Sequence, residues 1–112
     1  MNKKIAIPVN NGILDAHFGH SKQFAIFELK ENKILNESIL DAPPHEPGLL
    51  PKLFSEKGIT DVIAGGMGNK AIQLFQHAGV NVFVGAPQLP TRNLIEGFIN
   101  KTISFSANYC DH

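Results

Sequence analysis

The second half of the chain alternates short apolar runs with helical patterns, and this alternation restricts the fold more than any other feature. Residues 61–64 read Asp-Val-Ile-Ala and residues 81–84 read Asn-Val-Phe-Val, each followed by glycine. After each run, apolar residues recur at helical spacing: first Ala71, Ile72, Phe75 and Ala78, then Leu94, Ile95, Phe98 and Ile99. Strands that alternate with helices are joined by right-handed crossovers, so the pattern predicts two parallel β-α units.

The first half predicts local antiparallel pairing instead. Strand-like runs span residues 5–9, 24–29 and 33–40, and a Glu-Asn turn joins the last two. Strands so closely connected form an antiparallel hairpin. A proline-rich connector over 41–48 then leads to a helix over 49–57, which Gly58 ends.

The resulting order is β-β-β-α-β-α-β-α. We therefore expect an α/β protein with a mixed five-stranded sheet and helices on both faces, in a single domain over residues 1–112. The tail, about residues 104–112, is a candidate for disorder. This strand order resembles the ribonuclease H fold, whose nucleases hold metals with clustered carboxylates. Asp15, Glu28 and Asp61 are not placed as such a cluster, so a nuclease is not expected.

Composition excludes several classes of protein. Ten basic and ten acidic side chains cancel, which argues against broad electrostatic binding to nucleic acid or to an anionic membrane. No apolar run approaches about 18 residues and no signal-peptide core follows the N-terminus, so neither a membrane span nor export is expected. Cys110 is the only cysteine, so no intrachain disulfide can form. A cytoplasmic protein fits these features.

Three glycines stand where the strand over 61–64 meets the next helix, in the sequence Gly-Gly-Met-Gly over 65–68. We expect the first strand to lie in the middle of the sheet, so that this turn and the loop over 10–20 meet at the switch point where open α/β sheets bind ligands. Backbone N–H groups and the helix N-terminus can hold an anion there, with Lys70 close by. The alternative is that the glycines only let strand and helix pack closely.

Catalysis finds little support in the sequence. Gly66, Gly68 and Ala71 match the dinucleotide fingerprint, but residues 85–87 stand where the acidic ribose ligand should be. No serine lies in a nucleophile elbow, and no pattern identifies a nucleophile with its base. We therefore expect a protein that is not an enzyme.

Histidines supply the candidate metal ligands. His17 and His20 form an H-x-x-H pair beside the predicted cleft, and such a pair can point both imidazoles one way. Two ligands are too few for a structural zinc site, although Cys110 and His112 could complete a set of four. The alternative for Cys110 is an unpaired thiol in a flexible tail. His45, in the proline-rich connector, either caps a helix or lines the cleft.

Three stretches together resemble the dinitrogenase iron–molybdenum cofactor biosynthesis family, which includes NifX-like proteins and the C-terminal domain of NifB. They are "HFGHSKQFAIFEL", "PPHEPGLLPKLF" and "DVIAGGMGNKAIQLFQHAGVNVFVGA". The resemblance runs from about Lys4 to Ile103. It implies a ribonuclease H-like fold and a role in binding or carrying an iron–sulfur or iron–molybdenum cluster.

By that family pattern, the expected cofactor-binding residues are His17, Phe18, Gly19, His45, Gly65, Gly66, Met67 and Gly68. Asn69, which follows the glycine turn, is a further expected contact. The expected metal ligands are His17, His20 and His45, with Cys110 and His112 as further candidates. Clusters of this kind are bulky and anionic, so glycine N–H groups and a helix N-terminus suit them without several cysteines.

Two functions follow from these observations. The first is a small non-catalytic protein that binds or carries a metallocluster, with donor or acceptor proteins of cofactor biosynthesis as partners. The second is a regulatory or interaction module that binds a phosphate-bearing ligand or a protein through the same glycine turn. An exposed strand at the sheet edge would also allow a homodimer.

Overall fold

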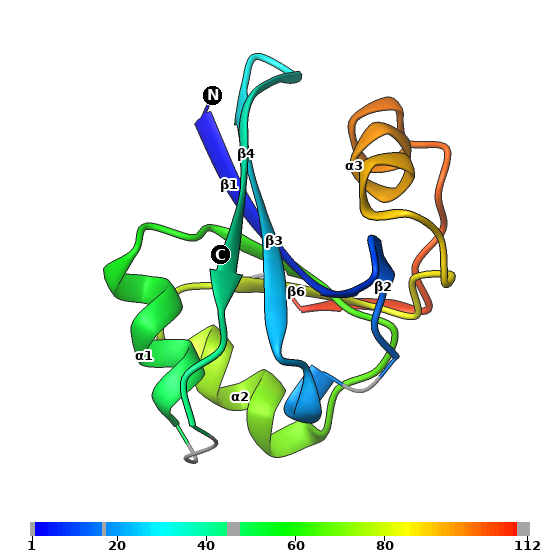
Figure 1. The fold of residues 1–112 in the computed structure, drawn as a ribbon. Coiled ribbons are helices and arrows are strands. Elements are labelled where there is room, and N and C mark those ends of the chain that lie inside the picture. Colours follow the sequence, from blue (N-terminus) through cyan, green and yellow to red (C-terminus); the bar gives the residue numbers. More distant parts are fainter. Residues whose placement is uncertain (1, 17, 45–47, 110–112) are drawn as a thin grey trace.

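The computed structural model describes residues 2–16, 18–44 and 48–109, which form one mixed sheet flanked by helices (Figure 1). The strands are β1 (Asn2–Asn10), β2 (Ile13–Leu14), β3 (Gln23–Lys30), β4 (Lys33–Asp41), β5 (Asp61–Ile63), β6 (Asn81–Val84) and β7 (Ala107–Tyr109). The helices are α1 (Leu49–Glu56), α2 (Asn69–His77), α3 (Thr91–Asn100) and a short 3₁₀ helix, η1 (Phe18–His20). The predicted mixed α/β sheet is confirmed.

The sheet has the order β4-β3-β1-β5-β6-β7, with β2 paired to β1 alone. β1 runs antiparallel to β3 and parallel to β5, and β5 runs parallel to β6. Successive strands are therefore added on one side of β1 (β3, then β4) and afterwards on its other side (β5, then β6), as the sequence predicts. The carboxyl ends of β1, β5 and β6 consequently lie along one edge of the sheet.

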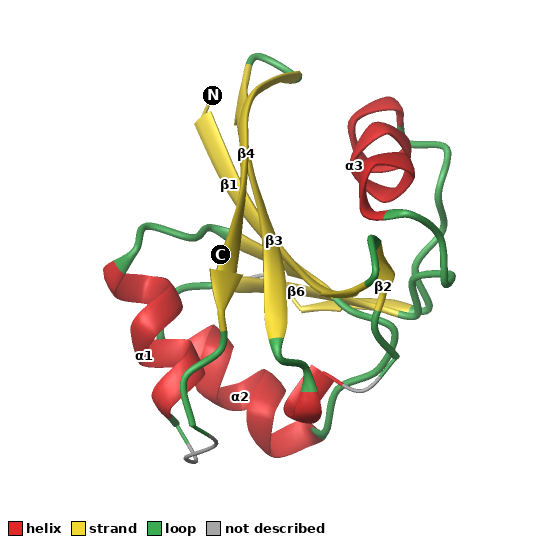
Figure 2. Cartoon of the chain, in the orientation of Figure 1, coloured by secondary structure: helices red, strands yellow, loops and turns green. Residues whose placement is uncertain are grey.

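Helices α1 and α2 cover one face of the sheet, and α3 covers the other (Figure 2). Four phenylalanines form the centre of the α1–α2 face, with ring centroids 5.1 to 5.6 Å apart: Phe18, Phe24, Phe54 and Phe75. On the other face, Leu94 and Ile95 of α3 pack with the buried isoleucines of β1 and β5. Helices must cover both faces of the sheet because the central strands carry buried apolar side chains on both sides.

The structure corrects two details of the predicted layout. The segment expected to be a plain loop contains β2 and η1, because Asn11 and Gly12 adopt φ values of 53° and 81° and close a two-residue hairpin between β1 and β2. Part of the tail considered for disorder forms β7, which pairs antiparallel with β6 and packs Tyr109 on the α1–α2 core. The sheet therefore has seven strands rather than five.

The predicted Glu-Asn turn also holds, and a proline inside α1 has a local reason. Pro51 is the third residue of α1, within the first turn, where a missing N–H breaks no helical hydrogen bond. Glu31 and Asn32 take φ values of 51° and 65°, which suit the tight turn between β3 and β4. Among the described residues, no helix has the length and apolar character that crossing a membrane requires.

Candidate functional site

Backbone hydrogen bonds tie together the segments that leave β5 and β6. The N–H of Gly85 donates to the carbonyl of Gly65 at 3.0 Å, and the N–H of Ala86 donates to that of Ala64 at 3.1 Å. The residues that follow β1 lie against the same place, because a Cβ on Gly65 would come close to the Leu14 side chain and the Ala16 backbone. The glycine turn and the loop after β1 therefore lie side by side at the carboxyl edge of the sheet.

These two segments line one pocket of about 320 Å³, which we name the glycine pocket. Its walls come from the loop with η1, from the glycine turn and from the first turn of α2. The lining residues are Ala16, Phe18, Gly19, His20, Gly66, Met67, Gly68 and Ala71.

All ten glycines lie within the described residues, and most of them have a local structural reason to be glycine. Five adopt positive φ, which L side chains rarely tolerate: Gly12, Gly48, Gly58, Gly79 and Gly85. A Cβ on Gly97 would collide with the Ile103 side chain, whereas one on Gly65 would make an ordinary van der Waals contact with Leu14 at 3.6 Å. The remaining three, Gly19, Gly66 and Gly68, have neither positive φ nor any atom within 4 Å of a Cβ position. All three line the glycine pocket.

Helix α2 begins at this pocket without a side-chain cap. Gly68 is the N-cap residue and offers no side chain, and the first turn carries no acidic residue. The first N–H groups of an α-helix have no partner within the helix, and they carry partial positive charge. Asn69 and Lys70 in this first turn are both exposed. The pocket therefore has an electropositive wall of backbone donors.

Phe18 anchors the opposite wall of the glycine pocket, formed by η1, to the hydrophobic core. Its ring is 6% exposed and lies 5.4 Å from Phe24 and 5.6 Å from Phe75, between centroids. Phe18 therefore anchors η1, and the following Gly19 and His20 are exposed beside the pocket. His20 also borders a polar depression that includes Asp15 and Asp41.

An apolar pocket of about 310 Å³ continues from the glycine pocket towards α1. The two pockets share Phe18, Gly19 and Ala71. The further walls come from the connector and from both helices: Pro43, Pro44, Gly48, Leu49, Leu50, Pro51, Lys70 and Leu74. The sequence analysis did not assign this apolar wall, although the Pro-Pro pair within the connector and the Leu-Leu pair directly after it were the available signal.

Several predicted ligands lie outside the described residues: His17, His45, Cys110 and His112. The described chain on either side of residues 45–47 borders the apolar pocket, through Pro44 and Gly48. Within the described ranges, no three His, Cys, Asp or Glu side chains lie together as a metal-ion site. The turn after β6 is not among the residues that line the glycine pocket, and Ser106 lies against Gly85 of this turn.

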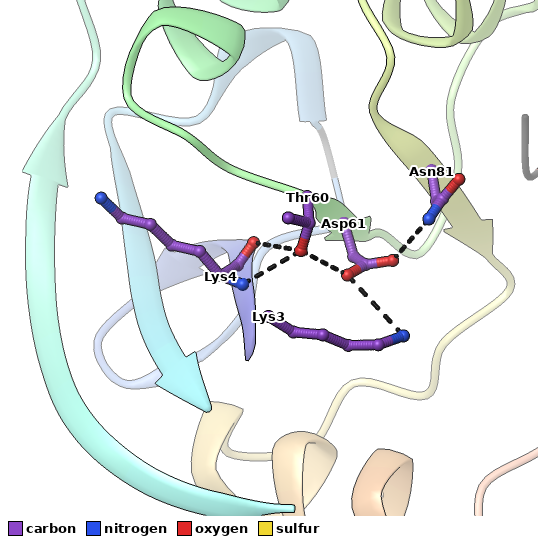
Figure 3. A network of polar contacts seen from close by, with 5 residues as sticks. All are labelled: Lys3, Lys4, Thr60, Asp61 and Asn81. Carbon is purple, nitrogen blue, oxygen red and sulfur yellow. Dashed lines mark hydrogen bonds and ion pairs between the residues drawn. The ribbon is translucent and has the colours of Figure 1, made fainter. Parts of the chain in front are cut away.

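A polar cluster occupies the amino end of the same parallel strands (Figure 3). The Asp61 carboxylate is 1% exposed and accepts hydrogen bonds from the Thr60 hydroxyl at 2.6 Å and from the Asn81 amide at 3.0 Å. The Lys3 ammonium lies 4.0 Å from it. The contacts of Asp61 therefore connect the amino ends of β1, β5 and β6.

Comparison with known proteins agrees with this architecture. A protein of Methanocaldococcus jannaschii described as uncharacterized protein MJ0580 is 31% identical over 85 residues, covering 71% of this chain and 72% of that protein. The crystal structure of PH0822 superposes with a TM-score of 0.85 at 25% identity, over 92% of this chain and 94% of the other.

The apo form of the orange protein from Desulfovibrio gigas superposes with a TM-score of 0.78 at 20% identity, over 97% of both chains, which shows a shared fold. The profile of the dinitrogenase iron-molybdenum cofactor family matches residues 1–101. The match covers nearly the whole sheet and all three α-helices. The chain belongs to the dinitrogenase iron–molybdenum cofactor family.

Proposed function

We propose that this chain is a small non-catalytic protein that binds or carries an anionic metal–sulfur cluster in the glycine pocket. The observation that supports this most is the distribution of glycines. Gly19, Gly66 and Gly68 are the three glycines that have neither a positive φ nor any atom within 4 Å of a Cβ position, and all three line this pocket. A missing Cβ at these positions leaves the main-chain N–H groups open to a bulky guest.

The other groups around the pocket suit such a guest. The uncapped N-terminus of α2 and the nearby Lys70 favour negative charge. His20 offers an imidazole, a nitrogen ligand that iron accepts. The adjoining apolar pocket would shield one side of the cluster from water. This donor set fits a preassembled cluster held mainly by hydrogen bonds better than a single ion held by a closed ring of ligands.

The finer identity follows from the family. We assign the cargo as an iron–molybdenum or iron–sulfur type cluster, and the role as a step in metal cofactor biosynthesis, with cluster donor and acceptor proteins as partners in the cytoplasm. His17 and His45 are proposed as further ligands, with Cys110 and His112 as alternatives, beside the proposed contacts Gly65, Met67 and Asn69. The strand order supports a ribonuclease H-like fold as the scaffold.

The test is cluster transfer without oxygen. The purified protein is mixed with a reduced iron–molybdenum–sulfur cluster, desalted, and analysed for metal content and visible absorption. We expect a coloured species with one cluster per chain. Gly66→Val should abolish uptake because its side chain fills the pocket, and His20→Ala should weaken it.

Ser55→Val is the matched control, since Ser55 is exposed on α1 and lines neither pocket. This variant should take up the cluster like the wild type. Circular dichroism should show all variants folded. Absence of uptake by the wild type, or equal uptake by Gly66→Val, would contradict the proposal.

A further inference from the structure

A second large pocket lies on the face of the sheet that α3 covers, and we name it the phenylalanine pocket. Its volume is about 590 Å³, within the range of about 300 to 1,000 Å³ that is usual for small-molecule sites. Its walls come from the start of β1, the β3–β4 turn, β6 and the segment from the last turn of α3 to Phe105. It shares no residue with the glycine pocket or the apolar pocket.

The phenylalanines of the chain divide between the core and this pocket. All eight lie within the described residues. Five are at most 6% exposed: Phe18, Phe24, Phe27, Phe54 and Phe75. The other three are only half-buried, and all three line the pocket: Phe83, Phe98 and Phe105. Their ring centroids lie 5.2 to 6.3 Å apart, so they form one aromatic surface that an apolar group of a ligand could cover.

Two side chains of opposite charge, Glu31 and Lys101, line the same pocket. Both are exposed, and neither forms an ion pair with another described residue. The third charged side chain of the lining, Lys3, already has partners. Its ammonium lies 4.0 Å from the Asp61 carboxylate and 5.3 Å from the centroid of the Phe98 ring. The pocket therefore offers a ligand one acid and one base beside an aromatic surface.

The backbone at Glu31 and Lys101 has a conformation that glycine adopts more easily. Their φ values are 51° and 59°. Helices α1 and α2 are followed by left-handed glycines, Gly58 and Gly79, whereas α3 is followed by the left-handed Lys101. A side chain costs stability in this conformation. Charged side chains at two such positions are consistent with a use for those side chains.

We propose that the phenylalanine pocket binds a free apolar α-amino acid, such as phenylalanine or leucine. The ligand side chain would lie on the three rings, its carboxylate against the Lys101 ammonium and its ammonium against the Glu31 carboxylate. A ligand with a single charge leaves one of these two groups without a partner. Because both ion pairs would lie at the surface, we expect an affinity in the millimolar range. This inference does not depend on the proposed cluster, since the two pockets share no residue.

An amide NMR titration of the ¹⁵N-labelled full chain tests the class of ligand. The compounds are L-phenylalanine, phenethylamine, which lacks the carboxylate, 3-phenylpropionate, which lacks the ammonium, and L-alanine, which lacks the ring. We expect L-phenylalanine to bind, both single-charge compounds to bind about three- to fivefold more weakly, and L-alanine not to bind. No binding of millimolar L-phenylalanine, or equal binding of the three aromatic compounds, would overturn the proposal.

Two glycine variants assign each ligand charge to its residue. Glycine suits the left-handed backbone at both positions, so both variants should fold. Lys101→Gly should weaken L-phenylalanine by the same factor without weakening phenethylamine, which has no carboxylate to lose a contact. Glu31→Gly should weaken L-phenylalanine without weakening 3-phenylpropionate, which has no ammonium.

Lys70→Ala is the matched control, because Lys70 borders the apolar pocket beside α1 and α2. It removes one lysine charge and should bind every compound like the wild type. If Lys101→Gly and Glu31→Gly left L-phenylalanine binding unchanged, or if Lys70→Ala weakened it as much as they do, the assignment to the phenylalanine pocket would be wrong.

Discussion

The two ends of the parallel strands β1, β5 and β6 differ in how their polar groups are used. At the amino end, the buried Asp61 carboxylate is matched by donors from Thr60 and Asn81 and by the nearby Lys3 (Figure 3). At the carboxyl end, α2 begins without a side-chain cap and three glycines leave the backbone open. Polar groups at the first end stabilise the fold, whereas those at the second end are available to a ligand.

This contrast gives a physical criterion for separating structural from functional residues. A substitution at the amino end should change the free energy of unfolding. A substitution at the glycine pocket should change ligand uptake and leave the free energy of unfolding almost unchanged. Active sites and binding sites are the places where local stability rules are expected to fail.

The largest effect should come from Asp61→Ala. Removal of the carboxylate leaves the Thr60 hydroxyl and the Asn81 amide without this acceptor in a buried site. We expect the free energy of unfolding to fall by about 2 to 4 kcal/mol, measured by urea denaturation. Glu56→Ala, at an exposed position, should change it by less than about 0.5 kcal/mol. A change of similar size in both variants would remove the structural role assigned to Asp61.

A smaller loss in the free energy of unfolding is expected from Gly85→Ala, because the local structure requires glycine at this position. Its φ of 85° disfavours any side chain, and a Cβ would lie 2.1 Å from the Ser106 Oγ. We expect a loss of about 2 kcal/mol in the same denaturation experiment. Unchanged stability would show that the β6–β7 connection can relax and that the glycine criterion is too simple.

The smallest effect on stability should come from Gly66→Ala in the glycine pocket. The residue has an ordinary φ and no neighbour within 4 Å of a Cβ. Loss of freedom in the unfolded chain should leave stability unchanged or raise it by up to about 1 kcal/mol. Cluster uptake should nevertheless decrease. A clear loss of stability would return Gly66 to the structural class and weaken the functional assignment.

The sequence predicts most of this architecture because its signals are local. Apolar periodicity marks β5, α2 and β6, and the turn glycines mark their ends. The position of the glycine turn beside the loop after β1 also follows, since the switch point depends only on strand order.

Other features depend on distant contacts that no local pattern encodes. The role of Asp61 requires the parallel register that sets it against Asn81, 20 residues later in the chain. The apolar pocket requires the connector, α1 and α2 to come together, so that Pro44 and Leu74 line the same pocket. Strand β7 forms because β6 offers an edge, which its own three residues do not reveal.

The central claim, that the glycine pocket holds an anionic metal–sulfur guest, is tested most directly by amide NMR of the ¹⁵N-labelled protein. Tetrathiomolybdate is a diamagnetic probe of the right charge and chemistry, and phosphate is the matched oxygen anion. We predict that tetrathiomolybdate shifts the amide signals of Gly19, Gly66 and Gly68 while phosphate leaves them in place. Unchanged signals at these three glycines, or equal shifts with phosphate, would contradict the account.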